Sequence, residues 1–480
     1  MAKDDRSAPL PGLRPISSWG RYPRVERQMA HAVVWPSDPL PTPVPGGSLL
    51  PFGQGRSYGD SCLNQDGTLL LTSGLDRLLG FDRRAGVVRC EAGVVLDTLL
   101  RLIVPQGWFL PVTPGTKFIS VGGAIANDIH GKNHHRAGAF GRHVRRFELL
   151  RSDGSRRVCS PEENRDWYQA TIGGLGLTGL IVWAEIQLQP ISNQYVLAET
   201  VPFPNLDAFF QLSRESEPGH EFTVAWLDSL ARGRTLGRGL FYRGNFAPPQ
   251  FDPIPTPRSH LSHRTTLGVP FDVPQVFVNR LSVTAFNRLY HAVQARKPGL
   301  RLSHYDPFFY PLDGLKTWNR VYGRQGFLEF QCVLPHDVAA AAVKEVLERS
   351  AREVPSSLTV LKIFGNVPSP GWMSFPRPGV TLVLDFANRG ERTWKFLGEL
   401  DQLTLDAGGA IYPAKDARMS PESFAAYYPQ LPRFEEYVDP AFSSSFWRRV
   451  NPDAGSRRKV PARGTAATSN SAASVPGARS

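Results

Sequence analysis

Cysteine is scarce in this chain of 480 residues, which contains only Cys62, Cys90, Cys159 and Cys332. The four stand far apart, and no C-x-x-C spacing occurs. A disulfide framework or a zinc cage requires closely spaced cysteines, so this distribution argues against both. We therefore predict no cysteine metal site and a chain suited to a reducing cytoplasm.

Long hydrophobic runs are also missing. No stretch approaches the roughly 18 consecutive apolar residues that a membrane-spanning helix requires. The N-terminus, MAKDDRSAPLPG, lacks the apolar core of a secretion signal. Hydrophobic residues still make up 41% of the chain and aromatic residues 11%, enough to bury a core that offsets the chain entropy. We therefore expect a folded, soluble, non-exported protein.

Lysine is rare although the chain is basic. Ten of the 55 basic residues are lysines, and the formal net charge at pH 7 is +12. Residues 454–480 hold five basic residues and no acidic one, and their lack of apolar periodicity predicts disorder. A basic surface can attract anionic lipid, a phosphorylated ligand or nucleic acid, or can simply be solvated. Nucleic acid is the least favoured partner, because no aromatic-interleaved basic helix or zinc-finger spacing occurs.

At this length one hydrophobic core is improbable, so two domains are expected. Residues 1–45 are rich in proline and glycine and predict an extended lead-in, with regular structure beginning at Gly47. Short strands and glycine-rich loops predict an α+β first domain over residues 46–193. From residue 194, aromatic strands and amphipathic helices predict a second domain in which helices cover a sheet.

Hydrophobic periodicity predicts the individual elements. The predicted strands are 68–72, 87–90, 147–150, 156–159, 180–188, 308–310, 327–333, 358–364 and 381–386. The predicted helices are 97–104, 162–171, 337–352 and 393–407. The dipeptide Asp153-Gly154 predicts a hairpin between two of the strands.

Four glycine-bearing segments occur in the predicted first domain, at residues 53–60, 114–116, 121–126 and 173–179. Glycine allows a positive φ and lets backbone amides approach a ligand oxygen, so such segments can hold a pyrophosphate. One segment alone would be explained equally well by a tight turn. Four in one domain favour a large phosphate-bearing cofactor.

Gly174, Gly176 and Gly179 spell G-x-G-x-x-G. The dinucleotide-binding fingerprint with this spelling requires a strand before it and a helix after it. In this chain a predicted helix precedes the glycines and a predicted strand follows them. We therefore interpret the match as coincidental and do not expect a doubly wound parallel sheet.

The densest polar stretch is residues 127–135, with the sequence NDIHGKNHH. His130 and His134 stand four apart, and on a helix this spacing would suit a metal. The glycine and asparagine between them disfavour a helix, and no acidic ligand is suitably spaced, so we predict no metal. The alternative is that His130 and Lys132 donate hydrogen bonds to a cofactor while the other histidines fix the loop or face solvent.

An ordered series of motifs runs along the chain: P-x-G-x-G-R-S-Y-G-D, L-P-V-x-P-G-T, V-G-G-A-I-A, D-I-H-G-K-N-H-H, G-x-G-L-T-G and A-K-D-x-R. This series resembles the vanillyl-alcohol-oxidase or PCMH-type family of FAD-linked oxidases, and within it the oxidases of polyprenyl-phosphate-linked pentoses. The resemblance covers about residues 51–449. Its most specific parts are 128–135 and 414–418.

The resemblance implies a two-domain α+β fold of the PCMH type. Residues 194–409 would form a substrate domain built from an antiparallel sheet and helices. Residues 410–453 would return to the FAD-binding domain.

FAD is the cofactor that the resemblance implies. The residues that match the family's cofactor contacts are Gly53, Gln54, Gly55, Arg56, Ser57, Tyr58, Gly59, Asp60, Ser61, Gly115, Ser120, Val121, Gly122, Gly123, Asn127, Asp128, Ile129, His130, Ile181 and Tyr412. Main-chain donors at the glycines would satisfy the pyrophosphate. Relatives that tether the flavin commonly have a histidine where this chain has Asp60, so we expect non-covalent FAD.

The residues that match the family's substrate face are Lys415, Tyr58, Lys132, Gln331 and Lys362. Alcohol oxidation by a flavin requires a positioned carbinol carbon and a group that handles the hydroxyl proton. Lys415 is the first candidate, and two roles remain open for it. It is a base if neighbouring cations or burial lower its pKa, or else a protonated group that orients the substrate and stabilises oxyanion charge.

Each candidate also has a structural alternative. Lys415 could be a surface lysine paired with Asp416, and Tyr58 a buried aromatic in a tight turn. Gln331 could face solvent from its strand. Lys362 lies in an apolar strand, where a lysine either extends to solvent or meets an anion.

The activity implied by the resemblance is oxidation of a ring hydroxyl of a polyprenyl-phosphate-linked pentose to a keto sugar, the first half of an epimerisation to the arabinose form. A short-chain reductase would reduce the product, and quinone or oxygen would accept the electrons. An aldonolactone or free-sugar oxidase is one alternative, and a non-catalytic flavin- or ligand-binding module is another. A polyprenyl substrate implies peripheral contact with the inner face of the plasma membrane, to which residues 454–480 could contribute.

Overall fold

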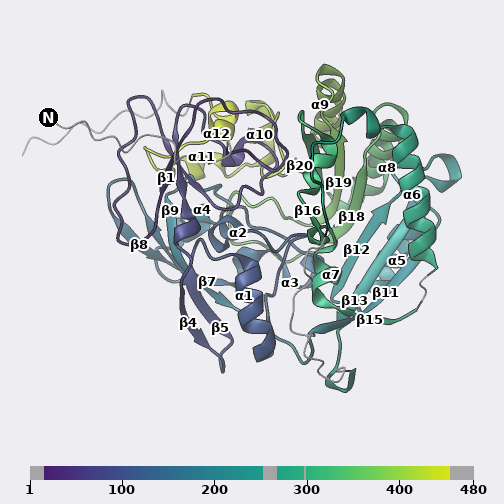
Figure 1. The fold of residues 1–480 in the computed structure, drawn as a ribbon, viewed down its shortest axis with the longest axis horizontal. Helices are drawn as coiled ribbons and strands as arrows, with labels where there is room; N and C mark the ends of the chain where they lie inside the picture. Colours follow the sequence, from purple (N-terminus) through teal and green to yellow (C-terminus); the bar gives the residue numbers. More distant parts are fainter. Residues whose placement is uncertain (1–15, 252–266, 297–298, 454–480) are drawn as a thin grey trace, which may run out of the picture.

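The computed structural model describes residues 16–251, 267–296 and 299–453. Helices and mostly antiparallel sheets form two halves side by side (Figure 1), which confirms the predicted α+β class. The disorder predicted for residues 454–480 lies outside the described residues. No helix in the described ranges is both long enough and apolar enough to span a bilayer.

The N-terminal half contains two main sheets. Its strands are β1 (Met29–Ala32), β2 (Leu49–Phe52), β3 (Thr68–Leu71), β4 (Leu78–Asp82), β5 (Val87–Glu91), β7 (Val144–Leu150), β8 (Arg156–Cys159) and β9 (Leu180–Gln187), and a short pair is formed by β6 (Trp108–Phe109) and β10 (Gln189–Pro190). The parallel sheet has the order β1-β3-β2, and the antiparallel sheet has the order β4-β5-β9-β7-β8. The predicted hairpin at Asp153-Gly154 joins β7 to β8, which pair antiparallel.

The prediction that regular structure begins only at Gly47 is wrong, because β1 lies within the lead-in. Met29 pairs in parallel register with Thr68 of β3. The four side chains of β1 are all exposed, so no buried alternation marks the strand in the sequence. Its formation depends on a distant partner strand.

Helices of the N-terminal half are α1 (Leu96–Ile103), α2 (Val121–Ala126), α3 (His134–Ala137) and α4 (Arg165–Thr171). Helix α4 begins three residues later than predicted. The hydroxyl of Ser160 accepts the amides of Glu162 and Glu163 and forms a turn there. The G-x-G-x-x-G glycines follow α4 and precede β9, the reverse of the dinucleotide-binding order, so the prediction of a coincidental match is confirmed.

The second half is built on one large antiparallel sheet. Its strands are β11 (Tyr195–Phe203), β12 (Phe222–Leu227), β13 (Gly239–Phe246), β15 (Arg301–His304), β17 (Phe327–Leu334), β18 (Leu358–Phe364), β19 (Gly379–Ala387) and β20 (Ala410–Ile411), and a short parallel pair is formed by β14 (Leu267–Gly268) and β16 (Leu315–Lys316). The order in the large sheet is β15-β11-β13-β12-β18-β19-β17-β20.

The helices of this half are α5 (Leu206–Ser216), α6 (Arg280–Ala295), α7 (Tyr305–Phe309), α8 (His336–Arg352) and α9 (Glu391–Asp406). Helices α5, α8 and α9 cover one face of the large sheet, and α6 packs on the other face, where Tyr290 contacts Trp226 and Tyr242. Figure 1 shows these helices around the sheet. The predictions of helices at 337–352 and 393–407 are confirmed by α8 and α9.

The strand predicted at 308–310 is wrong, because residues 308 and 309 end helix α7 and Tyr310 follows it. The side chain of His304 accepts the amide of Asp306 at 3.2 Å and so caps the helix. Proline at position 307 is tolerated in a first helical turn. Phe309 packs on Phe109, with ring centroids 5.2 Å apart. Aromatic residues favour strands on average, but here the cap and this tertiary packing decide the conformation.

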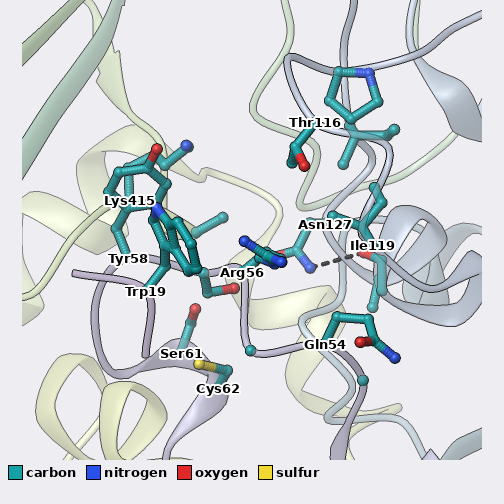
Figure 2. Close-up of a pocket in the computed structure, with 18 of the residues that line it drawn as sticks. Trp19, Gln54, Arg56, Tyr58, Ser61, Cys62, Thr116, Ile119, Asn127 and Lys415 are labelled. Atoms are coloured by element: carbon teal, nitrogen blue, oxygen red, sulfur yellow. Dashed lines mark hydrogen bonds between the residues drawn. The ribbon is translucent and has the colours of Figure 1, made fainter. Parts of the chain in front are cut away.

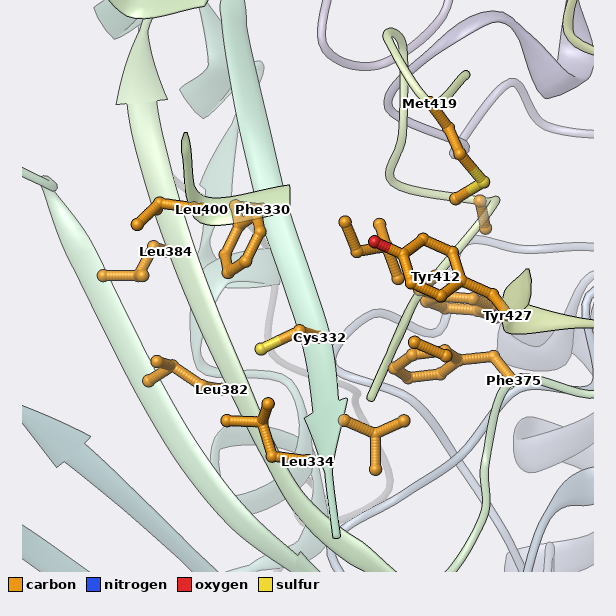
Figure 3. Packing of buried hydrophobic residues seen from close by; sticks show 14 of the residues in the cluster. Phe330, Cys332, Leu334, Phe375, Leu382, Leu384, Leu400, Tyr412, Met419 and Tyr427 are labelled. Carbon is orange, nitrogen blue, oxygen red and sulfur yellow. The ribbon is translucent and has the colours of Figure 1, made fainter. Parts of the chain in front are cut away.

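Strand β17 separates the helix-covered core from the other half of the molecule. Figure 3 shows Phe330, Cys332 and Leu334 of β17 beside Leu382 and Leu384 of β19 in the buried core. Because side chains alternate along a strand, the intervening residues of β17 point to the opposite face. That face is turned toward the N-terminal half.

After β20 the chain returns to the N-terminal half. Helices α10 (Pro421–Tyr427), α11 (Leu431–Glu435) and α12 (Ser445–Val450) lie over that half in Figure 1. Phe442 forms a bridge with Leu49 of β2. The C-terminal segment therefore packs against the N-terminal loops, while the boundaries at 193/194 and 409/410 stay predictions.

Candidate active site

A pocket lies where the glycine-bearing loops of the N-terminal half face the large sheet. Figure 2 shows Tyr58, Trp19 and Lys415 on one side of it, Thr116, Ile119 and Asn127 on the other, and Arg56 between them. The predicted cofactor residues that line it are Gly53, Gln54, Gly55, Arg56, Ser57, Tyr58, Ser61, Gly115, Ser120, Gly122, Gly123, Asn127, Ile129, His130, Ile181 and Tyr412.

Gly59 and Asp60 lie behind the pocket wall, where they attach the first glycine loop to the C-terminal segment. A Cβ on Gly59 would lie 1.7 Å from the carbonyl oxygen of Asp416. The carboxylate of Asp60 accepts two hydrogen bonds from Arg449, at 2.7 and 3.0 Å. Arg449 also reaches Asp416 at 3.0 Å. Burial raises the pKa of Asp60, and the Arg449 guanidinium opposes this shift.

Val121 and Asp128 are the other two predicted cofactor residues that do not line the pocket. Val121 is fully buried in the hydrophobic core. The buried carboxyl of Asp128 accepts the amide of Gly141 at 2.7 Å and the hydroxyl of Ser369. Burial raises the pKa of this carboxyl. Both residues support the loops whose neighbours reach the pocket.

The loops fit a bound FAD in two ways. Within the described part of the chain, the amides of Gly55, Arg56 and Ser57 donate to no protein acceptor, which leaves them available to phosphate oxygens. A Cβ on Gly53 would lie 2.3 Å from Oγ of Ser120. Only glycine allows the two loops to approach this closely.

Some residues that line the pocket have no recognisable signal in the sequence. Trp19 comes from the predicted lead-in, and its ring lies 4.1 Å from the guanidinium carbon of Arg56. Asp313 comes from the second half. No local pattern marks these residues, whereas Thr116 and Glu329 stood within segments already singled out.

Gln331 and His130 meet across the pocket. The side-chain amide of Gln331 donates to Nε2 of His130 at 2.9 Å. Burial, and next the charge of Lys362, lower the pKa of His130 well below its ordinary value. The ring is therefore neutral with its proton on Nδ1, a buried atom without a hydrogen-bond partner in the described residues. This proton is available to a ligand.

The other histidines of this stretch fix the loop. Helix α3 begins only at His134, so His130 and His134 do not share a helix, as predicted. The ring of His134 packs on Phe364 at 4.3 Å, and burial lowers its pKa to about 3. His135 contacts the carbonyl of His220 at 3.1 Å. Among the residues that the structure describes, no group of three or more His, Cys, Asp or Glu side chains could hold a metal ion.

Lys415 contacts both an acid and an aromatic ring. Its Nζ lies 3.0 Å from Oε1 of Glu329 and 3.6 Å from the ring centroid of Tyr58. The amide of Tyr58 donates to the carbonyl of Ala414 at 2.8 Å. Asp416, the alternative partner considered for Lys415, binds Arg449 instead. An ammonium with these contacts can hold a substrate oxygen in the pocket.

Lys362 and Lys132 add two half-buried lysines. Lys362 lines the pocket, and burial together with Lys415 lowers its pKa to about 8. Lys132 lies beyond the pocket wall and donates to the carbonyl oxygen of Phe308. Burial and Lys362 lower its pKa to about 7. Of the five predicted substrate-face residues, Lys132 is the one that does not line the pocket.

Comparison with known proteins identifies the family. Residues 45–160 match the family described as FAD binding domain. The chain is 35% identical over 420 residues to decaprenylphosphoryl-beta-D-ribose oxidase of Mycolicibacterium smegmatis, covering 84% of this chain and 89% of that protein. It is also 35% identical over 375 residues to an uncharacterized protein of Streptomyces coelicolor, covering 74% and 100%. L-gulonolactone oxidase of Mus musculus is 30% identical over 155 residues, covering 32% and 33%.

The regions that match these proteins include the segments that form the pocket. The family domain contains three of the four glycine-bearing segments that face the pocket, and the similarity to the mycobacterial oxidase extends over most of both chains. The protein is an FAD-dependent oxidoreductase with a two-domain α+β fold. The chain belongs to the PCMH-type family of FAD-linked oxidases.

Proposed function

We propose that this enzyme oxidises a ring hydroxyl of a polyprenyl-phosphate-linked pentose, of the decaprenylphosphoryl-ribose type, to a keto sugar. The main support is the position of Lys415, which comes from the C-terminal segment and reaches Glu329 of the large sheet inside the pocket. The extended similarity to a decaprenylphosphoryl-ribose oxidase supports the substrate class. A mixed surface of ammonium, amide and imidazole groups suits a polyhydroxylated ring.

The residues of the pocket have distinct roles in this proposal. FAD, when bound, accepts two electrons from the carbinol carbon. Lys415 holds the reacting hydroxyl and stabilises negative charge that develops on its oxygen. Gln331 and the neutral His130 orient the ring through hydrogen bonds. Lys362 adds positive charge that favours the phosphate-bearing substrate.

FAD is non-covalent in this proposal. Asp60 stands where a tethering residue would be expected, but its carboxylate is held by Arg449 and does not line the pocket. Precipitation of the enzyme with acid should release all of the flavin into the supernatant. Flavin that stays with the pellet would contradict this part of the proposal.

Anaerobic reduction tests the substrate class. The purified FAD-loaded enzyme should lose its visible flavin absorbance when mixed with polyprenyl-phosphate ribose, and should respond far more weakly to free ribose. Equal bleaching by the free sugar would remove the lipid-phosphate part of the proposal. If neither sugar bleaches the flavin, the proposal that the substrate is a pentose is wrong.

The second candidate is an aldonolactone or free-sugar oxidase, favoured by the partial similarity to the mouse L-gulonolactone oxidase. That similarity covers a third of each chain. The same anaerobic experiment with an aldonolactone separates the two candidates.

The proposed oxidation implies a partner enzyme, an electron acceptor and contact with a membrane. A keto sugar must be reduced to complete an epimerisation, which a short-chain reductase could do, and quinone or oxygen would reoxidise the flavin. Contact with the inner face of the plasma membrane would give access to a polyprenyl substrate. Sedimentation with anionic vesicles, before and after deletion of residues 454–480, tests this contact and the part of the basic tail.

A further inference from the structure

Two acidic side chains face each other on neighbouring strands next to Lys415. Glu329 of β17 and Asp385 of β19 are direct cross-strand partners. Opposed residues of an antiparallel pair project from the same face, with Cβ atoms about 5 Å apart. Glu329 is 7% exposed and Asp385 is fully buried. Two carboxyl groups at this spacing and burial cannot both ionise without a large cost.

The charge around this carboxyl pair is unequally distributed. Lys415 forms an ion pair with Glu329, and Lys362 of β18 adds a second positive charge near Glu329. The phenol groups of Tyr58 and Tyr322 also face the pair. Among the described residues, Glu329 therefore forms an ion pair with a cation, whereas Asp385 forms none.

Asp385 is the protonated member of the pair. Neither of its carboxyl oxygens makes a hydrogen bond of ordinary geometry within the described part of the chain. Burial, and next the Glu329 carboxyl, raise the pKa of Asp385 well above its ordinary value. A protonated carboxyl that lies beside an ionised one can donate its O–H to it.

A route leads from Asp385 toward solvent. The hydroxyl of Tyr322, in the short helix Trp318–Tyr322, neighbours Asp385 and lies 2.5 Å from Oγ of Ser357. Ser357 is half-buried, and its hydroxyl also donates to the main-chain oxygen of Asp385 at 3.2 Å. A proton on Asp385 thus has hydroxyl groups between it and the surface.

We propose that Glu329 and Asp385 form a carboxyl pair that holds one proton at rest and accepts the proton of the substrate hydroxyl from Lys415. The additional proton then leaves through Tyr322 and Ser357. This inference rests on the proposed oxidation of a hydroxyl group, and it assigns the destination of a proton that the oxidation must release.

Oxidation would break the carbinol C–H bond, with the hydrogen and both bond electrons passing to FAD as hydride, while the O–H bond would break and its electron pair would become the second C–O bond. Lys415 takes the hydroxyl proton as it transfers one of its own to Glu329, so it stays an ammonium. The carboxyl pair changes from one proton to two and returns to one when a proton reaches solvent.

An infrared measurement tests the resting pair without any substrate. The FAD-loaded wild-type enzyme at neutral pH should show the carbonyl band of a protonated carboxyl group. Asp385→Asn should remove this band. Asp406→Asn, at an exposed position of α9, is the matched control and should leave it unchanged. A wild-type spectrum without the band, or one that D385N leaves intact, would overturn the proposal.

Rapid mixing of the enzyme with the pentose substrate tests whether the carboxyl pair takes up the proton of the substrate hydroxyl. Glu329→Gln should lower the rate of FAD reduction by about 100-fold, the size expected for loss of a proton acceptor, and should flatten its pH dependence. Glu345→Gln, at a partly exposed position of α8 where the carboxylate pairs with Arg349, is the control. If E329Q reduces FAD at the wild-type rate, the proton relay is contradicted but the proposed oxidation is not. If no sugar reduces the enzyme, the proposed function fails while the infrared result still decides the pair.

The variants could lose activity by unfolding, so FAD content and thermal unfolding are measured for each. Tyr322→Phe provides a separate check, because it removes one hydroxyl and keeps the ring that packs on Phe327. It should slow proton release to a pH indicator while electron transfer in the first turnover proceeds. Proton release at the wild-type rate in Y322F would exclude this exit route.

Discussion

The guanidinium of Arg449 binds the carboxylate of Asp60, with Nη2 2.7 Å from Oδ1, although 389 positions separate the two residues in the chain. Arg449 also binds Asp416 at 3.0 Å. Both carboxyl groups are buried. One arginine therefore joins the first glycine loop to the segment that carries Lys415.

Arg449→Met should destabilise the enzyme strongly. Removal of one partner from a buried ion pair leaves uncompensated charge, which costs about 3–5 kcal/mol. Denaturant unfolding measures this loss, and dialysis measures the weaker retention of FAD that a displaced loop should cause. Arg433→Met, at an exposed ion pair with Asp166, is the control and should change stability little. Equal stability of R449M and R433M would contradict the role given to Arg449.

Gly59→Ala should prevent the first glycine loop from packing against the segment that carries Lys415. Its new methyl group would lie 1.7 Å from the carbonyl oxygen of Asp416, a backbone atom that cannot move away easily. We expect little FAD in the purified variant and a lower unfolding temperature. Gly80→Ala is the matched control, because no heavy atom lies within 4 Å of its added Cβ. Normal FAD content in G59A would show that this contact is not needed.

Lys415→Ala should abolish most of the activity without loss of the cofactor. An ammonium that stabilises charge at the reacting oxygen contributes about 10²–10³-fold to the rate. Stopped-flow reduction of FAD by the substrate measures the effect, and the flavin absorbance confirms loading. Lys395→Ala, on the exposed side of α9, should behave as the wild type. Turnover of K415A within tenfold of the wild type would rule out the assigned role.

Stability should depend on pH through Lys362. Burial, and next Lys415, lower its pKa in the folded protein from 10.5 to about 8. Between these values the unfolded chain binds more protons than the folded one, so the free energy of unfolding should rise with pH in this window. The gain is complete above 10.5 and is lost as the pH falls through 8.

The comparison with Lys362→Met isolates this effect. Denaturant unfolding of the two proteins across the window should give a smaller rise for K362M. Lys395→Met should keep the wild-type dependence, because its lysine is exposed. Parallel curves for wild type and K362M would mean that Lys362 titrates as an ordinary lysine.

Much of the local structure was predictable from the sequence. Strand β18 has the predicted bounds, and α8 and α9 follow from apolar residues repeated at helical spacing. The glycine segments identified the loops that line the pocket, because the close approach of a backbone to a ligand favours a residue without a side chain. The motif around Lys415 pointed to its importance, although not to Glu329 as its partner.

Other features required the tertiary structure. The helix at Tyr305–Phe309 depends on a cap and on aromatic packing, and β1 depends on a partner 39 positions later in the chain. The pairing of Glu329 with Asp385 depends on strand register. Periodicity in the sequence reports which face of an element is buried, because burial alternates with the local geometry of the backbone. It does not report which distant residue lies opposite, and the charges, pKa values and contacts of this site are set by those distant neighbours.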